Sequence, residues 1–264
     1  MTDILVSSRW RRMSRGEARE WENTVVKALI FDVFGTVVDW RTGVAQQAEA
    51  FFRRHGIDVD AESFADAWRA KYQPALERVR SGSRGYVPLD VLHRENLEEV
   101  VAEFGIEASI EASEIAEFSR AWEKLPPWPD SVPGLIDLKK RHAIAPCSNG
   151  SIALMTWLAK HAGLPWDAIL GADIAQAYKP QPEVYLRSAS ALGLSPREVM
   201  MVAAHNNDLL AAREQGLRTG FVPRPQELGH GQSINLEPES NWDIVATDFN
   251  DLARRLENWS ASTG

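Results

Sequence analysis

Polar and ionisable side chains stand directly after short apolar runs at several points in the sequence. The first is Asp32, which lies between Phe31 and Val33. A carboxylate in apolar surroundings can act as a nucleophile or move a proton, although a lone Asp more commonly caps a turn. Its interpretation therefore depends on its neighbours. Later apolar runs are followed by further polar groups: Ser148 and Asn149, then Tyr178 and Lys179, then His205, Asn207 and Asp208.

These side chains form a site only if the segments before them belong to one sheet. Residues 25–31 form a short, mostly apolar, β-favouring run that is typical of a buried parallel strand. After the proline-rich boundary at 126–129, strand-like and helix-like segments alternate. We predict strands over 143–147, 168–172, 199–204, 219–222 and 243–246, and helices over 132–142, 151–162, 183–192, 208–215 and 252–259.

This alternation predicts an α/β fold, a doubly wound parallel sheet with a Rossmann-like core. Ligands of such sheets bind beyond the carboxyl ends of the strands. The polar groups named above stand at those ends, and chance would seldom place so many of them there.

Residues 43–125 show a different sequence pattern, with helix-like segments over 45–55, 62–80, 89–104 and 111–122 separated by glycines. We see no convincing strand there and predict an all-helical cap inserted after the first strand. The catalytic core would then comprise 25–42 and 126–264. Residues 1–24 are basic and polar, without an apolar signal-peptide stretch, and we predict a disordered leader.

The overall composition excludes several classes of protein. The chain has 264 residues and a net charge of −8, which argues against a nucleic-acid surface. It lacks an apolar run long enough for a membrane span. Its single cysteine, Cys147, excludes an intramolecular disulfide and fits a reducing, cytoplasmic location. A homodimer is a common assembly of soluble enzymes, and it stays open here.

The polar clusters also resemble the motifs of a known family. The run from Phe31 to Asp39 (FDVFGTVVD) resembles the first motif of the haloacid dehalogenase superfamily. Residues 148–150 resemble the second motif, 178–180 with Tyr185 the third, and 202–208 occupy the place of the fourth. Each motif alone is weak, but four in order around a helical insertion are specific. The pair Trp68-Arg69 in the insertion is similar to a pair in the L-2-haloacid dehalogenases (type II).

The superfamily also holds phosphatases, which the chemistry of the motifs can separate. Those enzymes have a second Asp two residues after the nucleophile, and it protonates the leaving alcohol. Phe34 occupies that position here and cannot transfer a proton. Phosphatases also need magnesium held by several oxygens, whereas the fourth motif here offers one acid, Asp208. A departing halide needs neither the proton nor the metal, so we expect no metal and no cofactor.

The resemblance implies a role for each matched residue. Asp32 would be the nucleophile, Lys179 would keep it ionised, and Asp208 would anchor Lys179 and help to place the hydrolytic water. The substrate or halide would be bound by Phe34, Thr36, Arg69, Ser148, Asn149, Tyr185 and Asn207. The structural alternatives are a surface arginine for Arg69 and a core tyrosine for Tyr185.

Two positions depart from the usual dehalogenase pattern, because Ala203 and His205 stand where a Ser and an Asn are usual. His205 can donate, accept or act as a base near neutral pH, so it would share water activation with Asp208. A structural His at a strand end is the alternative. A His donor and an aromatic-lined pocket would suit a small, strongly accepting leaving group such as fluoride.

The sequence therefore predicts hydrolysis of a small anionic 2-haloacid through an aspartyl ester. We expect haloacetates to be preferred, with fluoroacetate among the candidates. A superfamily phosphatase with atypical motifs and a non-catalytic small-acid-binding homologue are the alternatives.

Overall fold

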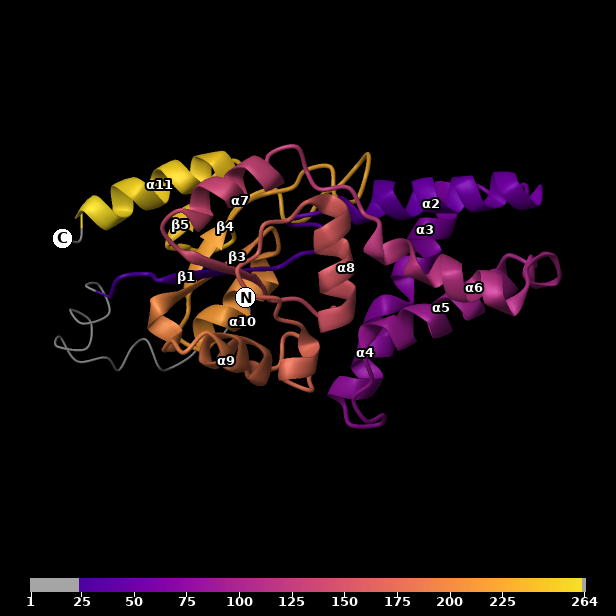
Figure 1. Cartoon of the computed structure of the whole chain (residues 1–264), viewed down its shortest axis with the longest axis horizontal. Coiled ribbons are helices and arrows are strands. Elements are labelled where there is room, and N and C mark those ends of the chain that lie inside the picture. The colour runs from indigo at the N-terminus through magenta and orange to yellow at the C-terminus, as the bar shows by residue number, and fades with distance from the viewer. Residues whose placement is uncertain (1–23, 263–264) are drawn as a thin grey trace, which may run out of the picture.

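A computed structural model describes residues 24–262 of the chain and places a parallel sheet at its centre (Figure 1). The strands are β1 (Ala28–Phe31), β2 (Ala143–Pro146), β3 (Val199–Ala203), β4 (Arg218–Phe221) and β5 (Ile244–Val245). They lie in the order β2-β1-β3-β4-β5, and each neighbouring pair is parallel. This confirms the predicted α/β class.

Helices cover both faces of the sheet because side chains alternate along each strand. On β1, Leu29 and Phe31 join one buried apolar cluster, and Ala28 and Ile30 join another. Figure 1 shows α7 (Ser131–Lys139) and α11 (Phe249–Ser262) above the strands, with α9 (Pro182–Ala191) and α10 (Asn206–Glu214) below them. The helix α8 (Ile152–Ala162) packs with the first cluster. The sheet is therefore doubly wound, as predicted.

The strand predicted over residues 168–172 is wrong. This segment is irregular and leads into a 3₁₀ turn, η4 (Ala172–Ile174). Gly171 lies against the backbone of residues 150–152, where a Cβ would come within 2.5 Å of the Ile152 nitrogen. The chain thus turns toward the loop after β2 instead of extending the sheet.

The inserted cap is helical and lies beside the carboxyl edge of the sheet (Figure 1). It contains α2 (Trp40–His55), α3 (Ala61–Ala70), α4 (Tyr72–Arg80), α5 (Leu89–Glu103) and α6 (Ala112–Phe118). The helix predicted over 62–80 breaks after Ala70. Pro74 explains the break, because proline has no N–H to donate to the carbonyl of Ala70. Short 3₁₀ turns complete the connections: η2 (Glu107–Ser109), η3 (Ser119–Glu123) and, in the core, η5 (Pro196–Glu198).

Helix α2 begins earlier than predicted because Asp39 caps it, accepting a hydrogen bond from the Thr42 nitrogen. The proposed division at 42/43 therefore falls inside α2. Hydrogen bonds join the two regions, among them Tyr178 Oη to the Val87 carbonyl at 2.5 Å and Arg80 Nη1 to the Lys179 carbonyl at 2.8 Å. The predicted leader falls, except for Thr24, outside the described residues.

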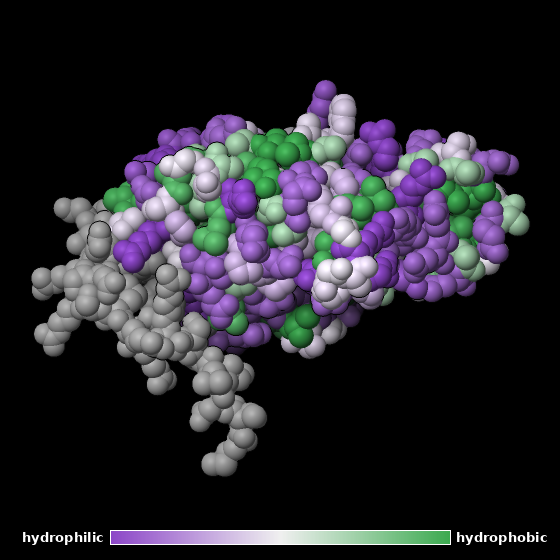
Figure 2. All heavy atoms as spheres, turned by 90° about the horizontal axis from the view of Figure 1, so that it is seen from below, coloured by the Kyte–Doolittle hydropathy of each residue, from purple (hydrophilic) through white to green (hydrophobic). Residues whose placement is uncertain are grey.

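The surface seen in Figure 2 is mostly hydrophilic, and its apolar side chains lie in separate small groups. Within residues 24–262, no helix combines the length and apolarity that a membrane crossing requires. A cytoplasmic location stays a prediction.

Candidate functional site

A pocket of about 300 Å³ opens between the carboxyl edge of the sheet and the cap. Its lining brings together residues that are far apart in the sequence. Nearly all the residues predicted for the site line it: Asp32, Phe34, Arg69, Ser148, Asn149, Lys179, Tyr185, His205, Asn207 and Asp208. Thr36 is fully buried directly behind Asp32.

The two oxygens of the Asp32 carboxylate have unequal surroundings. Oδ1 accepts from Lys179 Nζ at 3.1 Å. Oδ2 accepts from Thr36 Oγ1 at 2.6 Å and lies 3.0 Å from His205 Nδ1. Thr36 itself accepts from the Ala204 nitrogen at 2.9 Å, which leaves its hydroxyl proton for Asp32.

Burial by itself would raise the pKa of Asp32, but Lys179 and His205 outweigh it and hold that pKa well below its ordinary value. The carboxylate is therefore ionised at neutral pH. Its Oδ1 has one donor, Lys179, and its Oδ2 has two, Thr36 and His205.

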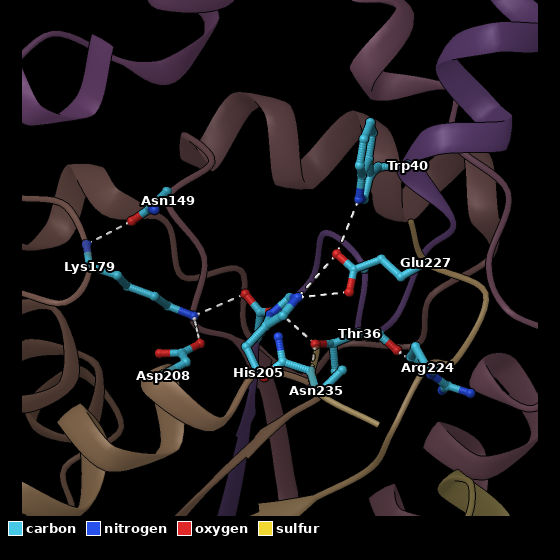
Figure 3. A network of polar contacts seen from close by, with 12 residues as sticks. Thr36, Trp40, Asn149, Lys179, His205, Asp208, Arg224, Glu227 and Asn235 are labelled. Atoms are coloured by element: carbon cyan, nitrogen blue, oxygen red, sulfur yellow. Dashed lines mark hydrogen bonds and ion pairs between the residues drawn. The ribbon is translucent and has the colours of Figure 1, made fainter. Parts of the chain in front are cut away.

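Lys179 is buried and bridges two carboxylates, because its Nζ also donates to Asp208 Oδ2 at 2.6 Å. Burial lowers the pKa of Lys179, but Asp208 and Asp32 outweigh it and raise the pKa above its ordinary value. The Lys179 backbone nitrogen donates to Asn149 Oδ1 at 2.8 Å, which holds this segment in place. The lysine is thus a fixed cation beside Asp32, and Figure 3 shows its contact with Asp208.

Asp208 lies near the start of α10 and is held from two sides. Its Oδ1 accepts from Tyr185 Oη at 2.6 Å, opposite the bond from Lys179. Burial raises the pKa of Asp208, and the nearby charge of Asp32 raises it further, against the opposing effect of Lys179. Asp208 is therefore better suited than Asp32 to take up a proton.

His205 stands between two carboxylates. Nδ1 faces Asp32 Oδ2, and Nε2 lies 2.9 Å from Glu227 Oε2. Both ring nitrogens face acceptors, so both must carry a proton to be satisfied. Burial lowers the pKa of His205, but Glu227 and Asp32 outweigh it and raise the pKa to about 10. This geometry favours a donor cation over the base that the sequence suggested.

Glu227 is a residue of the site that the sequence analysis missed. It is buried in the loop after β4, and its Oε1 also accepts from Trp40 Nε1 at 3.1 Å (Figure 3). Gly35, with φ of 87°, makes room for it, because a Cβ there would come within 2.1 Å of Glu227 Oε1. No motif marks Glu227. The available signal was its place after a strand whose carboxyl end meets the same edge.

Arg224 fixes the loop that carries Glu227. Its Nε donates to the Thr36 carbonyl at 2.9 Å, and its two terminal nitrogens bind Asp130 at 2.6 and 2.9 Å. Paired bonds of this kind fix orientation as well as distance. The loop is therefore tied to the turn that follows Asp32.

The cap supplies the opposite wall of the pocket. The guanidinium of Arg69 lies 4.0 Å from the ring centre of Tyr72 and 5.2 Å from that of Trp40. Its Nη1 is buried and has no hydrogen-bond partner among residues 24–262. Phe34 meets the ring of Trp122 edge-on at 5.6 Å. The pocket thus has an aromatic side that includes a cationic donor without such a partner.

A metal site is not apparent in residues 24–262, where no group of three or more His, Cys, Asp or Glu side chains is placed to hold an ion. The Asp32 and Asp208 carboxylates, which could serve as ligands, are instead bridged by the Lys179 ammonium.

Comparison with known proteins bears out the motif resemblance. A family model described as haloacid dehalogenase-like hydrolase matches residues 26–216. The structure of the defluorinating L-2-haloacid dehalogenase Rha0230 is 52% identical, with a TM-score of 0.87, over 88% of this chain and 95% of that one. The structure of the L-2-haloacid dehalogenase PA0810 is 45% identical, with a TM-score of 0.85, over 88% and 99% of the two chains. The (S)-2-haloacid dehalogenase of Xanthobacter autotrophicus is 29% identical over 239 residues, 89% of this chain and 88% of its own length.

Proposed function

Because the chain belongs to the haloacid dehalogenase-like hydrolases, we propose that it hydrolyses the carbon–halide bond of small 2-haloacids with Asp32 as nucleophile. The chain is a hydrolase acting on carbon–halide bonds, as its relatives are. The identity of the substrate, the covalent intermediate and the roles of the site residues are the proposed part.

One observation carries this proposal. An ionised carboxylate and an arginine whose Nη1 has no hydrogen-bond partner among residues 24–262 line the same small pocket. A 2-haloacid brings an anionic carboxylate and a carbon with a leaving group, and these match Arg69 and Asp32. Phe34 offers no proton to a leaving group, and a departing halide needs none. A phosphate ester would need that proton, so the same pocket is poorly suited to it.

In the first step, Arg69 and neighbouring donors hold the anion while Asp32 Oδ1 attacks the carbon that bears the halogen. The new Oδ1–carbon bond takes an electron pair from Asp32, and the carbon–halogen pair leaves with the halide. The product is an aspartyl ester with inverted configuration at a chiral carbon. Asn149 and Asn207 line the pocket, and Ser148 also faces it, so these polar groups can orient the substrate.

In the second step, water attacks Cγ of Asp32 and gives up a proton to Asp208, whose raised pKa suits it as base. The Cγ–Oδ1 bond then breaks, and the departing alkoxide takes the proton. A 2-hydroxyacid leaves with Oδ1, and the water oxygen remains in Asp32, which becomes a carboxylate again when the second proton of the water passes to solvent. Asp208 places the water, and Tyr185 holds Asp208. Both ring nitrogens of His205 are already engaged by Asp32 and Glu227.

The space beside Asp32, rather than the total volume of the pocket, favours haloacetates over longer 2-haloacids. A volume of about 300 Å³ lies at the lower end of the range for small-molecule sites. Phe34 and the aromatic wall behind it fill space beside Asp32. Fluoroacetate is included in the proposal because the similar structure of Rha0230 is described as a defluorinating dehalogenase.

The proposal is tested by incubating the protein, in the presence of EDTA, with chloroacetate, fluoroacetate, 2-chlorobutyrate and para-nitrophenyl phosphate. Halide is followed by ion chromatography and nitrophenol by absorbance. We expect halide release without metal and faster turnover of chloroacetate than of 2-chlorobutyrate. Nitrophenol release only after magnesium is restored would replace the proposal with a phosphatase. Tight binding of the acids without any turnover would indicate a non-catalytic binding protein.

A further inference from the structure

Glu227 and Trp40 belong to no motif, yet they complete a chain of contacts that ends on the nucleophile. Trp40 donates to Glu227, and Glu227 faces His205 (Figure 3). His205 in turn faces Asp32 Oδ2. This series of contacts joins distant parts of the sequence, because Trp40 begins α2 and Glu227 lies in the loop after β4. A buried carboxylate requires such partners, since desolvation is costly without them.

The position of Glu227 is tightly determined. Both carboxylate oxygens of Glu227 lie within 3.0 Å of His205 Nε2. These contacts fix the orientation of the imidazole ring. Gly35 leaves no side chain in the way, and Arg224 ties the start of the loop to Thr36 and Asp130. The ring therefore presents Nδ1 to Asp32 in one orientation.

The two donors on Asp32 Oδ2 matter in only one of the two half-reactions. When Oδ1 attacks, negative charge leaves the carboxylate, so donors on Oδ2 do not assist that step. When water attacks Cγ of the ester, an electron pair moves onto Oδ2 and makes it an oxyanion. Fixed donors aimed at such an oxygen stabilise the transition state, and Thr36 and His205 are aimed there.

We propose that Glu227 is a positioning residue that holds His205 as a double donor, so that His205 and Thr36 form the oxyanion hole for hydrolysis of the Asp32 ester. The step is balanced. Water bonds to Cγ, the Cγ–Oδ2 π pair moves onto Oδ2, and Asp208 takes one proton of the water. Collapse expels the alkoxide carrying Oδ1, which takes that proton from Asp208, and the second proton of the water leaves Asp32 for solvent. This inference rests on the proposed function, and it assigns a task to a residue outside every motif.

The test separates the two half-reactions in Glu227→Gln. Chloroacetate is mixed with the enzyme and the reaction is quenched over time. Halide in the quench reports formation of the ester, and intact-protein mass spectrometry reports the carboxymethyl adduct. We expect a normal halide burst and an adduct that decays about 10- to 100-fold more slowly than in the wild type. This is less than the roughly 10²- to 10³-fold for outright removal of an oxyanion donor, because His205 itself remains. Glu237→Gln, an exposed change in the same loop, should behave as the wild type does.

His205→Asn provides a second variant that removes the cation and keeps an amide donor. It should also accumulate adduct, and adding Glu227→Gln to it should slow decay no further, because the two residues act through one contact. Thermal melts check that each variant folds, and either single variant carries the test if the other does not fold.

Equal slowing of halide release and adduct decay, or additive effects of the two changes, would mean that Glu227 has a general structural role, and this would overturn the inference. Absence of halide release from the wild type would instead refute the proposed function, and the inference with it.

Discussion

The core and the cap contribute opposite kinds of polar group to the same pocket. On the core side, the charged groups around Asp32 are saturated, since Lys179, His205, Asp208 and Glu227 each make close contacts with partners of opposite charge. On the cap side, Nη1 of the pocket-lining Arg69 is buried and has no hydrogen-bond partner among residues 24–262.

This difference separates two tasks. Saturated hydrogen bonds fix a nucleophile and its water before the substrate arrives, so little reorganisation is needed during reaction. A buried donor without a partner, such as Arg69 Nη1, costs free energy, and an anion that accepts from it would offset that cost. The core is thus organised for the reaction, and the cap is organised for the ligand.

The largest expected loss of activity follows a substitution on the core side of the pocket. Asp32→Asn removes the charge of the nucleophile with almost no change in shape, and halide release should fall by roughly 10⁴-fold or more. Release is measured by ion chromatography with chloroacetate in excess. Asp58→Asn, an exposed change between α2 and α3, should retain full activity.

Isotope labelling in the wild type checks the same point. A single turnover in oxygen-18 water should place the label in Asp32, because water attacks Cγ. Label that appeared in the hydroxyacid during the first turnover would contradict the covalent route.

A smaller effect is expected on the cap side. Arg69→Lys keeps the charge and loses the planar fork, so kcat/KM for chloroacetate should fall by about 10²-fold, as expected for loss of a charge-assisted hydrogen bond. The change should appear mainly in KM if Arg69 binds the substrate carboxylate, and mainly in kcat if it binds the departing halide. Arg78→Lys on the exposed side of α4 is the matched control. Unchanged kinetics in Arg69→Lys would place the anion elsewhere.

The smallest expected effect is on stability, and it tests whether the buried His93 of the cap is neutral. Burial, reinforced by the charge of Arg69, holds the pKa of His93 well below 6.5. The unfolded chain binds a proton below about pH 6.5 that the folded chain excludes, so this contribution is present above that pH and is lost as the pH falls below it.

His93→Phe should therefore flatten the fall in the free energy of unfolding between about pH 6.5 and pH 5, by up to about 1.4 kcal/mol per pH unit. The free energy is measured by urea unfolding across this range. His161→Gln, at an exposed histidine of α8, should keep the wild-type profile. Parallel curves for His93→Phe and the wild type would show that His93 is not held neutral by its surroundings.

The sequence predicted most of the fold and the reacting groups on the core side. Asp32 and Asp208 were found because each follows a strand, and parallel strands bring their carboxyl ends together. Lys179 was found through the third motif, although no strand precedes it in the structure. Arg69 was found through its resemblance to a motif pair, and the structure places it on the pocket wall. The errors arose where local pattern is weak, as in the strand over 168–172, which close packing of Gly171 turns into a loop.

The sequence by itself determined the class of sheet, the helical insertion and the order of the polar clusters, because hydrophobic periodicity and motif spacing are local properties. Tertiary structure alone decided the state of His205. That state depends on Glu227, which lies 22 residues away in a loop without periodicity, and on Gly35, which leaves room for its carboxylate. A proton is held by the charges that surround it in space, and no local pattern records which distant carboxylate the fold will bring there.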